Sequence, residues 1–268
     1  MTYQTILYDV SEGIATITLN RPEKLNAWTP TMGLEIRAAL EASVANVDAR
    51  VIILTGAGRG FCAGADMNDL ADISASGQTE TREFTPFDDT ARADFHHAMT
   101  YFPSVKKPII AAINGVAAGL GFAMLMFCDL RFSSETASFV SSFARRGLIA
   151  EHGTSWMLTR LVGHSRAMDM MLSSRKVSAG EALRIGLVDR VSVDVLDEAR
   201  TYARDLAELS SPRSLGIIKR QLWNSLFQDL QSAIKDADAE MVLSLKSDDF
   251  REGVAHFLEK RAPRFTGT

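Results

Sequence analysis

Apolar and polar residues near the start of the chain alternate in the short runs that are typical of β-strands. Three such runs lie at residues 6–10, 14–19 and 51–55. Between the last two, apolar residues recur at helical spacing after Thr29, a good N-cap residue, with Pro30 at the first helical position. The pattern predicts two strands, a helix and a third strand. The apolar positions of the helix are Met32, Leu34, Ile36, Leu40 and Val44.

An uncharged stretch at residues 109–128 is long enough to span a membrane. Asn114, Gly115 and Gly119 interrupt it, however, and these residues favour turns and helix boundaries. We therefore interpret the stretch as a buried strand at 109–113, a turn, and a buried helix from about Gly119. No membrane segment is predicted.

Strand and helix signals continue to alternate as far as a strand at 130–133, which favours an α/β fold of repeated ββα units. Residues 70–95 interrupt this order because they are polar, and they predict a mobile loop with a helix resuming near Thr90. After Ala167 the chain becomes mostly helical. Helices are expected near residues 167–172, 179–185, 195–209, 212–227, 229–245 and 248–259.

Composition excludes several classes of protein. The net charge of −4, without long runs of like charge, gives no electrostatic footprint for nucleic acid. Cys62 and Cys128 are far apart and form no Cys-x-x-Cys pair, so we expect no disulfide framework and a cytoplasmic location. The first residues lack the pattern of a secretory signal.

Two glycine-rich segments carry the candidate chemistry. The first, residues 55–66, follows a strand but has Phe61 at the third glycine position of a dinucleotide fingerprint and lacks the end of a P-loop. By itself it also fits an ordinary turn. The second, residues 114–122, leads from a strand into an apolar helix, whose free N–H groups favour negative charge. Two such backbone corners can converge on one developing oxyanion.

Motifs along nearly the whole chain resemble those of the crotonase superfamily, the enoyl-CoA hydratase/isomerase group. The matches are Asn20-Arg-Pro, Asn26-Ala27, Gly60-Phe-Cys-Ala-Gly-Ala-Asp66, Lys107-Pro108, Ala112-Ile-Asn-Gly115, Ala118-Gly-Leu-Gly121, Cys128-Asp129, Arg160-Leu-Val-Gly163, Ala182, Gly186-Leu-Val188 and Phe257-Leu-Glu-Lys-Arg261. The resemblance implies a spiral of ββα units over residues 1–195. It also implies a helical trimerisation region over 196–268 and a homotrimer or a dimer of trimers.

The same resemblance implies a site. The backbone N–H groups of Ala65 and Leu120 would form an oxyanion hole for the enolate of an acyl-CoA thioester. Coenzyme A would enter as part of the substrate, with no separate cofactor and no metal. The residues at positions that bind coenzyme A in relatives are Lys24, Ala27, Ala63, Ala65, Asp66, Met67, Asn68 and Leu120. Lys24 fits a solvated surface lysine equally well.

Acid and base groups decide the reaction. The two glutamates of typical hydratases correspond here to Ala123 and Phe143. Glu151 instead lies where some isomerases of the family, and a dehalogenase, carry a catalytic carboxylate. Its alternative role is to cap the helix that begins near Thr154. The apolar Leu148-Ile149-Ala150 approach predicts an apolar environment for its carboxyl group.

The histidines are weaker candidates. His152 is interpreted as an ordinary surface or hydrogen-bonding histidine, and His96 and His97 lack companions at metal-ligand spacing. We expect isomerisation of an enoyl-CoA double bond with Glu151 as general acid/base. The alternatives are hydration, another crotonase reaction such as thioester hydrolysis, dehalogenation or C–C cleavage, and an acyl-CoA-binding scaffold without catalysis.

Overall fold

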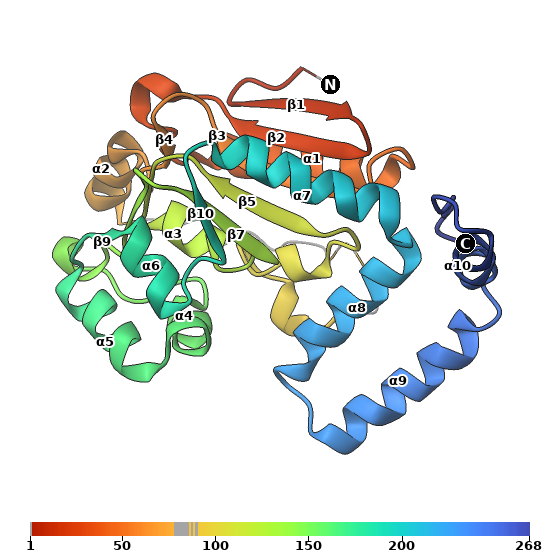
Figure 1. Cartoon of the computed structure of the whole chain (residues 1–268). Helices are drawn as coiled ribbons and strands as arrows, with labels where there is room; N and C mark the ends of the chain where they lie inside the picture. The colour runs from red at the N-terminus through yellow and green to blue at the C-terminus, as the bar shows by residue number, and fades with distance from the viewer. Residues whose placement is uncertain (1, 78–85, 87, 89–90) are drawn as a thin grey trace.

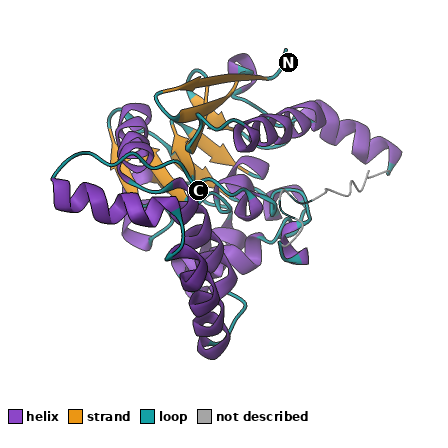
Figure 2. Ribbon diagram, turned by 90° about the vertical axis from the view of Figure 1, so that its right-hand side faces the viewer, coloured by secondary structure: helices purple, strands orange, loops and turns teal. Residues whose placement is uncertain are grey.

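Two sheets form the centre of the molecule in the computed structural model, which describes residues 2–77, 86, 88 and 91–268. The larger sheet has the order β1-β2-β3-β5-β7-β10, and the smaller has the order β4-β6-β8-β9. All pairs are parallel except β1 with β2 and β8 with β9. Helices surround the strands (Figures 1 and 2). The strands are β1 Ile6–Ser11, β2 Ile14–Leu19, β3 Val51–Gly56, β4 Gly60–Cys62, β5 Ile109–Ile113, β6 Val116–Ala118, β7 Leu130–Ser134, β8 Ser138–Val140, β9 Val177–Ser178 and β10 Arg190–Ser192.

The α/β class and the order of the ββα units agree with the sequence pattern. Successive strands enter alternate sheets, β3 and β4 and then β5 and β6, before a helix follows. The helices are α1 Pro30–Ala45, α2 Met67–Ser76, α3 Leu120–Leu125, α4 Thr154–Val162, α5 His164–Ser173, α6 Ala179–Ile185, α7 Val195–Leu209, α8 Pro212–Ser225, α9 Leu230–Ser244 and α10 Asp248–Glu259. Each helix predicted after Ala167 is confirmed, with small differences at the ends.

Helices cover both faces of the larger sheet. Ile52 and Leu54 of β3 face the cluster that contains α1, whereas Val51 and Ile53 face α7. Helix α7 meets the sheet through small residues, so it can lie close against the strands (Figure 1). These small residues are Ala199, Ala203 and Ala207. Such two-sided burial is characteristic of parallel sheets.

Helix α1 begins as predicted, because the Thr29 side chain accepts a hydrogen bond from the Met32 N–H. Met32, Ile36 and Leu40 are buried on one face at four-residue spacing. Leu34 is 49% exposed, so its assignment to the apolar face is wrong. The reason is geometric: residue 34 lies midway between residues 32 and 36 and therefore on the other side of the helix.

The uncharged stretch is a strand, a turn and a helix, as predicted, but the turn contains an additional short strand, β6. In the described part of the chain, no helix is both long and apolar enough to cross a bilayer. Cys62 and Cys128 are free and buried. Burial raises the pKa of the Cys62 thiol to about 11 and that of Cys128 to about 12.

The loop predicted at residues 70–95 is partly wrong. Helix α2 continues to Ser76 because Asp66 caps its first turn and Gly77 ends it in the left-handed conformation. Residues 78–85 and Thr90 lie outside the described residues. Beyond them, residues 91–104 contain two short 3₁₀ helices, Ala93–Phe95 and Phe102–Ser104, rather than the α-helix that was expected.

Helix α8 is fastened to the core through a buried ion pair. The Lys219 ammonium lies 2.8 Å from the Asp129 carboxylate and also donates to the Phe102 and Lys107 carbonyls. The Trp223 indole N–H donates to the same carboxylate at 2.7 Å. Burial lowers the pKa of Lys219, and the negative charge of Asp129 opposes that effect. The multiple partners compensate for removing both charges from water.

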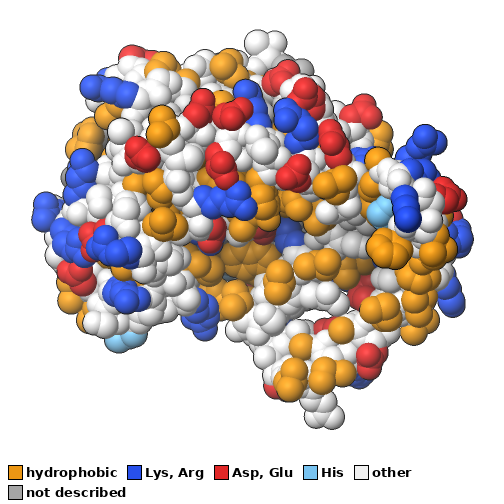
Figure 3. All heavy atoms as spheres, in the orientation of Figure 1, with side chains coloured by type: hydrophobic (Ala, Val, Ile, Leu, Met, Phe, Trp, Pro, Cys, Tyr) orange, Lys and Arg blue, Asp and Glu red, His pale blue; other side chains and the backbone are white. Residues whose placement is uncertain are grey.

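Helices α9 and α10 form an arm that projects from the body beyond α8 (Figure 1). Hydrophobic atoms are exposed along this arm and in the hollow between it and the body (Figure 3). The predicted division of the chain into a core over residues 1–195 and a helical region over 196–268 stays a prediction. Helix α7, which follows that boundary, lies against the larger sheet. The large apolar side chains exposed on the arm are Leu230, Ile234, Met241, Val242, Leu243, Phe250, Val254, Phe257 and Leu258.

Candidate functional site

The first glycine-rich segment holds the peptide between Gly64 and Ala65 in a fixed direction. The Gly64 carbonyl accepts the Trp28 N–H at 2.7 Å, and the Trp28 carbonyl accepts the Asp66 N–H at 2.9 Å. In a trans peptide the C=O and the following N–H point opposite ways. The Ala65 N–H therefore points away from Trp28.

The second segment exposes a matching donor at the start of α3. The Gly119 carbonyl accepts the Ala123 N–H at 2.9 Å, and no side chain caps this end of the helix. The Leu120 N–H, in the same peptide as the Gly119 carbonyl, therefore points outward from the helix N-terminus. Gly119 has a φ of 49° and a ψ of −116°, a conformation that strongly favours glycine.

The two corners touch because glycines allow their backbones to meet. A Cβ on Gly64 would lie 3.1 Å from the Ala118 carbonyl oxygen, and one on Gly119 would lie 3.6 Å from the Gly64 Cα. A Cβ on Gly121 would lie 2.4 Å from the Cys62 carbonyl oxygen. The parallel pairing of β4 with β6 continues this contact. The structure thus brings together the two corners that carry the predicted donors, Ala65 and Leu120.

Side chains that the sequence reasoning missed hold the first corner in shape. Asn26 is fully buried, accepts the Arg21 N–H, and donates to the Ala57 and Gly60 carbonyls. It has a φ of 56°, a left-handed value that asparagine tolerates better than most residues. The Asn20-Arg-Pro and Asn26-Ala27 motifs contain this signal, but their contacts join segments that are distant in sequence.

Asp66 has a structural partner in the same corner. Its carboxylate lies 2.8 Å from the Arg21 guanidinium, which also donates to the Ala27 carbonyl at 2.7 Å. The hydrogen bond from Arg21 is the main cause that lowers the pKa of Asp66. The Asp66 carboxylate also accepts the Asn68 N–H at the start of α2. Its charge is therefore engaged within the chain, and we assign it the role of holding the loop.

The remaining predicted coenzyme A positions surround this corner at the surface. Lys24 is exposed at the end of a 3₁₀ helix that spans Pro22–Lys24, while Ala27 and Ala63 are half-buried. Met67 and Asn68 are exposed on the first turn of α2. Together these positions form a partly exposed rim beside the Ala65 N–H.

The two positions that hold glutamates in typical hydratases are occupied here by buried apolar residues. Ala123 is fully buried in α3, and Phe143 is 3% exposed. Neither position offers a group that can transfer a proton.

Glu151 lies in the turn before α4. Its backbone carbonyl accepts the Thr154 N–H at 3.0 Å, but the N-cap residue is Gly153, and no side chain caps the helix. Its carboxylate therefore does not have the capping role. The prediction of an apolar approach is wrong, since Leu148 and Ile149 are 43% and 80% exposed in an open turn.

His152 is the nearest titratable partner of Glu151. Its Nε2 lies 3.7 Å from the Glu151 carboxylate. Burial lowers the pKa of His152, and the Glu151 charge opposes that effect. His152 also has a φ of 52°, an unusual value for a non-glycine residue. The ring does not lie freely on the surface but lines a cleft.

That cleft has a volume of about 450 Å³, and aromatic side chains form part of its walls. His152 and Gly153 form one side of it, directly after Glu151. Residues in the segment 94–100, which is distant in the sequence, also line the cleft and include His97. His96 is not among the lining residues. The aromatic members of the lining are Phe95, Phe127, Trp156 and Phe227.

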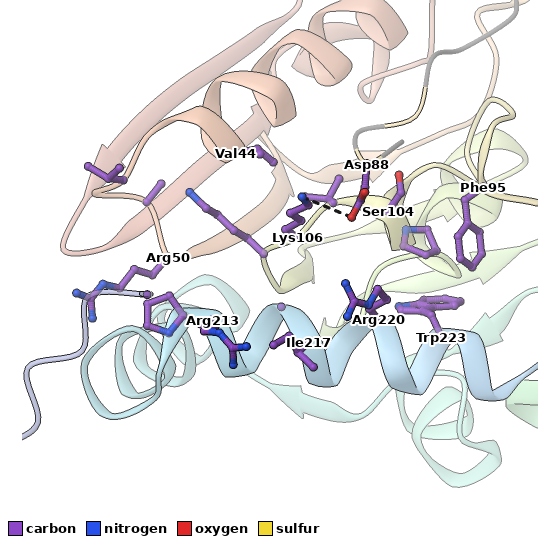
Figure 4. A pocket seen from close by; sticks show the side chains of 18 of the residues that line it. Val44, Arg50, Asp88, Phe95, Ser104, Lys106, Arg213, Ile217, Arg220 and Trp223 are labelled. Carbon is purple, nitrogen blue, oxygen red and sulfur yellow. Dashed lines mark ion pairs between the residues drawn. The ribbon is translucent and has the colours of Figure 1, made fainter. Parts of the chain in front are cut away.

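A second cleft, of about 410 Å³, lies between the end of α1, residues 103–107 and α8 (Figure 4). It is rich in basic residues, but intrachain partners engage them. Lys106 pairs with Asp88 at 3.5 Å, and Lys107 donates to two carbonyls at the end of α1. Arg50 donates to two further carbonyls, and Arg220 pairs with Glu240. Neither this cleft nor the aromatic one is lined by Ala65 or Leu120. The aromatic cleft lies next to Glu151 through His152 and Gly153, whereas the basic cleft does not, so we do not place the chemistry in the basic one.

Comparison with known proteins identifies the family. The family model described as enoyl-CoA hydratase/isomerase matches residues 9–268. The chain belongs to the enoyl-CoA hydratase/isomerase family. It is 38% identical over 269 residues to a Rhodobacter capsulatus protein named "Probable enoyl-CoA hydratase", with all of both chains covered. It is 35% identical to the Escherichia coli 1,2-epoxyphenylacetyl-CoA isomerase, with 98% of both chains covered.

Solved structures of this family have the same fold. A crystal structure described as a putative enoyl-CoA hydratase from Streptomyces coelicolor superposes with a TM-score of 0.87 at 30% identity, and covers all of this chain and 96% of that one. One from Geobacillus kaustophilus, named as an enoyl-CoA hydratase subunit, gives 0.84 at 34% identity over 99% of both chains. The predicted crotonase-type spiral is therefore confirmed.

The contact between the two corners yields a prediction about Gly121. Replacing it with alanine should force α3 away from β4, because the added Cβ would meet backbone atoms of Cys62. We expect Gly121→Ala to lower the melting temperature by at least about 4 °C. The matched control is Gly180→Ala in α6, where a Cβ meets nothing within 4 Å. Equal melting temperatures for the two variants would contradict the proposed tight contact.

Proposed function

We propose that the protein isomerises the double bond of an enoyl-CoA thioester, with Glu151 as the general acid/base. The observation that carries this proposal is which of the candidate positions for an acid/base group hold a carboxylate. Both positions that hold glutamates in typical hydratases are buried and apolar, at Ala123 and Phe143, whereas Glu151 is partly exposed beside a cleft. A relative at 35% identity is named as an isomerase of an acyl-CoA.

The reaction needs one proton carrier and one oxyanion hole. In this proposal the Glu151 carboxylate removes a proton from the α-carbon of a 3-enoyl thioester, which leaves a dienolate. The Ala65 and Leu120 N–H groups stabilise the charge on the thioester oxygen. The protonated Glu151 then returns the proton to the γ-carbon, and the double bond moves to the 2-position. The product has the same composition as the substrate, and the carboxylate is regenerated.

Hydration is the second candidate, because the Rhodobacter capsulatus relative carries a hydratase name. Hydration must add water at the β-carbon and a proton at the α-carbon. Two carboxylates share this work in typical hydratases, whereas one carboxylate suffices to shuttle a proton between two carbons. His152 is adjacent to Glu151 and is a further titratable group that could activate water.

A glutamine at position 151 should separate these possibilities. Glu151→Gln preserves the size of the side chain but removes the base, so we expect kcat for 3-enoyl-CoA isomerisation to fall by about 10²-fold or more. The Kd for a saturated acyl-CoA should change little. The measurement is steady-state isomerisation of 3-enoyl-CoA alongside hydration of crotonyl-CoA, for both proteins.

The matched control is Glu135→Gln, an exposed glutamate in the turn after β7, which should retain wild-type rates. Robust crotonyl-CoA hydration that survives Glu151→Gln would refute the proposal, because another group would then carry the chemistry.

The rim beside Ala65 supports recognition of the coenzyme A moiety. Lys24 is exposed there and offers a positive charge, and the chain from Ala63 to Asn68 presents backbone groups. We expect free coenzyme A to bind, and Lys24→Ala to weaken binding of both free coenzyme A and acyl-CoA by the same factor. Isothermal titration calorimetry measures both affinities. No detectable binding of either ligand would exclude this assignment.

We further propose that the protein forms a homotrimer or a dimer of trimers, as its resemblance to the family implies. The support is the projecting arm of α9 and α10, whose apolar residues would remain in water on a single chain. Light scattering at micromolar concentration should give three or six copies. Val242→Glu on the arm should shift the protein toward monomers, whereas Val193→Glu, an exposed valine before α7, should not. A wild-type monomer would rule out the assembly.

A further inference from the structure

The segment that leads to Glu151 and the rim beside Ala65 meet through one pair of side chains. Arg146 ends the 3₁₀ helix that spans Ala144–Arg146, and its guanidinium donates to the Met67 sulfur at 3.1 Å. Met67 is the first residue of α2 and directly follows the Asp66 cap. The contact therefore brings a permanent positive charge to the edge of the predicted coenzyme A site, from a segment that is distant in the sequence.

The thioether is a weak partner for this guanidinium. Methionine sulfur is a neutral, weak acceptor, whereas a guanidinium binds carboxylates and phosphates through pairs of parallel hydrogen bonds. In the part of the chain that the structure describes, no carboxylate pairs with Arg146, and the residue is exposed. The preceding Arg145, by contrast, donates to the Ser173 carbonyl. Arg146 therefore retains most of its donors for a ligand.

Lys24 supplies a second cation beside the same corner. It is exposed at the end of its 3₁₀ helix and has no carboxylate partner among the described residues. The next residue, Leu25, accepts the Ala63 N–H at 3.0 Å, which holds this segment against the corner. The hydrogen bond from Arg21 is the main cause that lowers the pKa of Asp66, and the charge of Lys24 also contributes. Lys24 and Arg146 thus flank the start of α2.

Acidic side chains in the same area limit the general positive field. Asp66 is engaged by Arg21. Glu23 is exposed next to Lys24, and Asp69 lies in the first turn of α2. Since these charges offset one another at a distance, an anion at this rim has to be bound by direct contact with a cation that has no carboxylate partner.

We propose that Arg146 binds a phosphate group of the coenzyme A moiety, with Lys24 as the cation on the other flank of α2. The inference rests on the proposed acyl-CoA function and names a binding residue at that site. Coenzyme A carries a pyrophosphate bridge and a 3′-phosphate, and either group accepts two hydrogen bonds from a guanidinium. On binding, the guanidinium exchanges the Met67 sulfur for phosphate oxygens, and the flexible methionine side chain can repack. The contact is remote from the reacting carbons, so Arg146 contributes to affinity rather than to proton transfer.

The test compares two saturated ligands that differ in their phosphates. Butyryl-CoA carries them, whereas S-butyrylpantetheine has the same thioester and pantetheine arm without any phosphate. Arg146→Met removes the charge and keeps a long side chain. We expect it to weaken butyryl-CoA binding by about tenfold, which corresponds to about 1.4 kcal/mol, and to leave the affinity for S-butyrylpantetheine unchanged. Calorimetry measures both affinities, with the pantetheine ligand titrated at millimolar concentration.

Two further variants and one further ligand make the result specific. Arg146→Lys keeps the charge but not the planar fork, so it should weaken butyryl-CoA by less than Arg146→Met. The matched control is Arg200→Met, an exposed arginine on α7, which should change neither affinity. Butyryl-dephospho-CoA lacks the 3′-phosphate. Equal weakening of this ligand by Arg146→Met would assign the contact to the pyrophosphate, and no weakening would assign it to the 3′-phosphate.

The outcomes distinguish this inference from the proposed function. Equal weakening of butyryl-CoA and S-butyrylpantetheine by Arg146→Met would overturn the phosphate contact, because the side chain would then act on the fold or on the thioester. Unchanged butyryl-CoA affinity would also overturn it, while leaving the proposed reaction in place. Loss of isomerase activity in every assay, with the phosphate-dependent effect of Arg146→Met intact, would refute only the reaction. Thermal melts verify that each variant is folded.

Discussion

The contact between two backbone corners is the constraint on which the site depends. The chain around β4 and the chain around β6 approach so closely that a Cβ on Gly121 would lie 2.4 Å from the Cys62 carbonyl oxygen, and one on Gly64 only 3.1 Å from the Ala118 carbonyl oxygen. This approach gives the Ala65 and Leu120 N–H groups a fixed relation, because both belong to peptides whose carbonyls are already hydrogen-bonded. Fixed dipoles of this kind need little reorganisation as charge develops in a reaction.

The surrounding side chains serve that backbone geometry. Asn26 ties the left-handed turn to Ala57 and Gly60, and the Arg21–Asp66 pair joins the same turn to the start of α2. These polar groups are inside the protein, but each has partners, so their burial is compensated. Because the donors are main-chain atoms, positions such as 123 and 143 can change without loss of the corner. In the proposed function, the Glu151 carboxylate then determines the type of reaction on an unchanged backbone scaffold.

The hydrophobic pattern predicted most of the architecture, because buried apolar residues recur at the regular spacing that is characteristic of strands and of long helices. It failed for Leu34 because residue 34 lies on the side of the helix opposite to the buried Met32 and Ile36. It missed α2, where the cap at Asp66 and the stop at Gly77 outweigh a polar composition. The motifs indicated both corners. The aromatic cleft was not predictable in this way, because its rings come from segments up to about 130 residues apart, and their sequence neighbours do not indicate where they meet.

The position of the aromatic cleft also bears on which parts of the fold can change independently of the backbone contact. Helix α3 has the predicted oxyanion donor at its first residue and the Phe127 ring just beyond its last turn, so one helix lies next to both the backbone corner and the aromatic cleft. The remaining walls come from the chain around Phe95, from α4 and from the end of α8, which joins the core through Asp129 and Lys219. Substitutions in those walls would alter the cleft without moving α3 against β4. The shape of the cleft can therefore change without disturbing the backbone contact, provided that the Asp129 hydrogen bonds hold α8 in place.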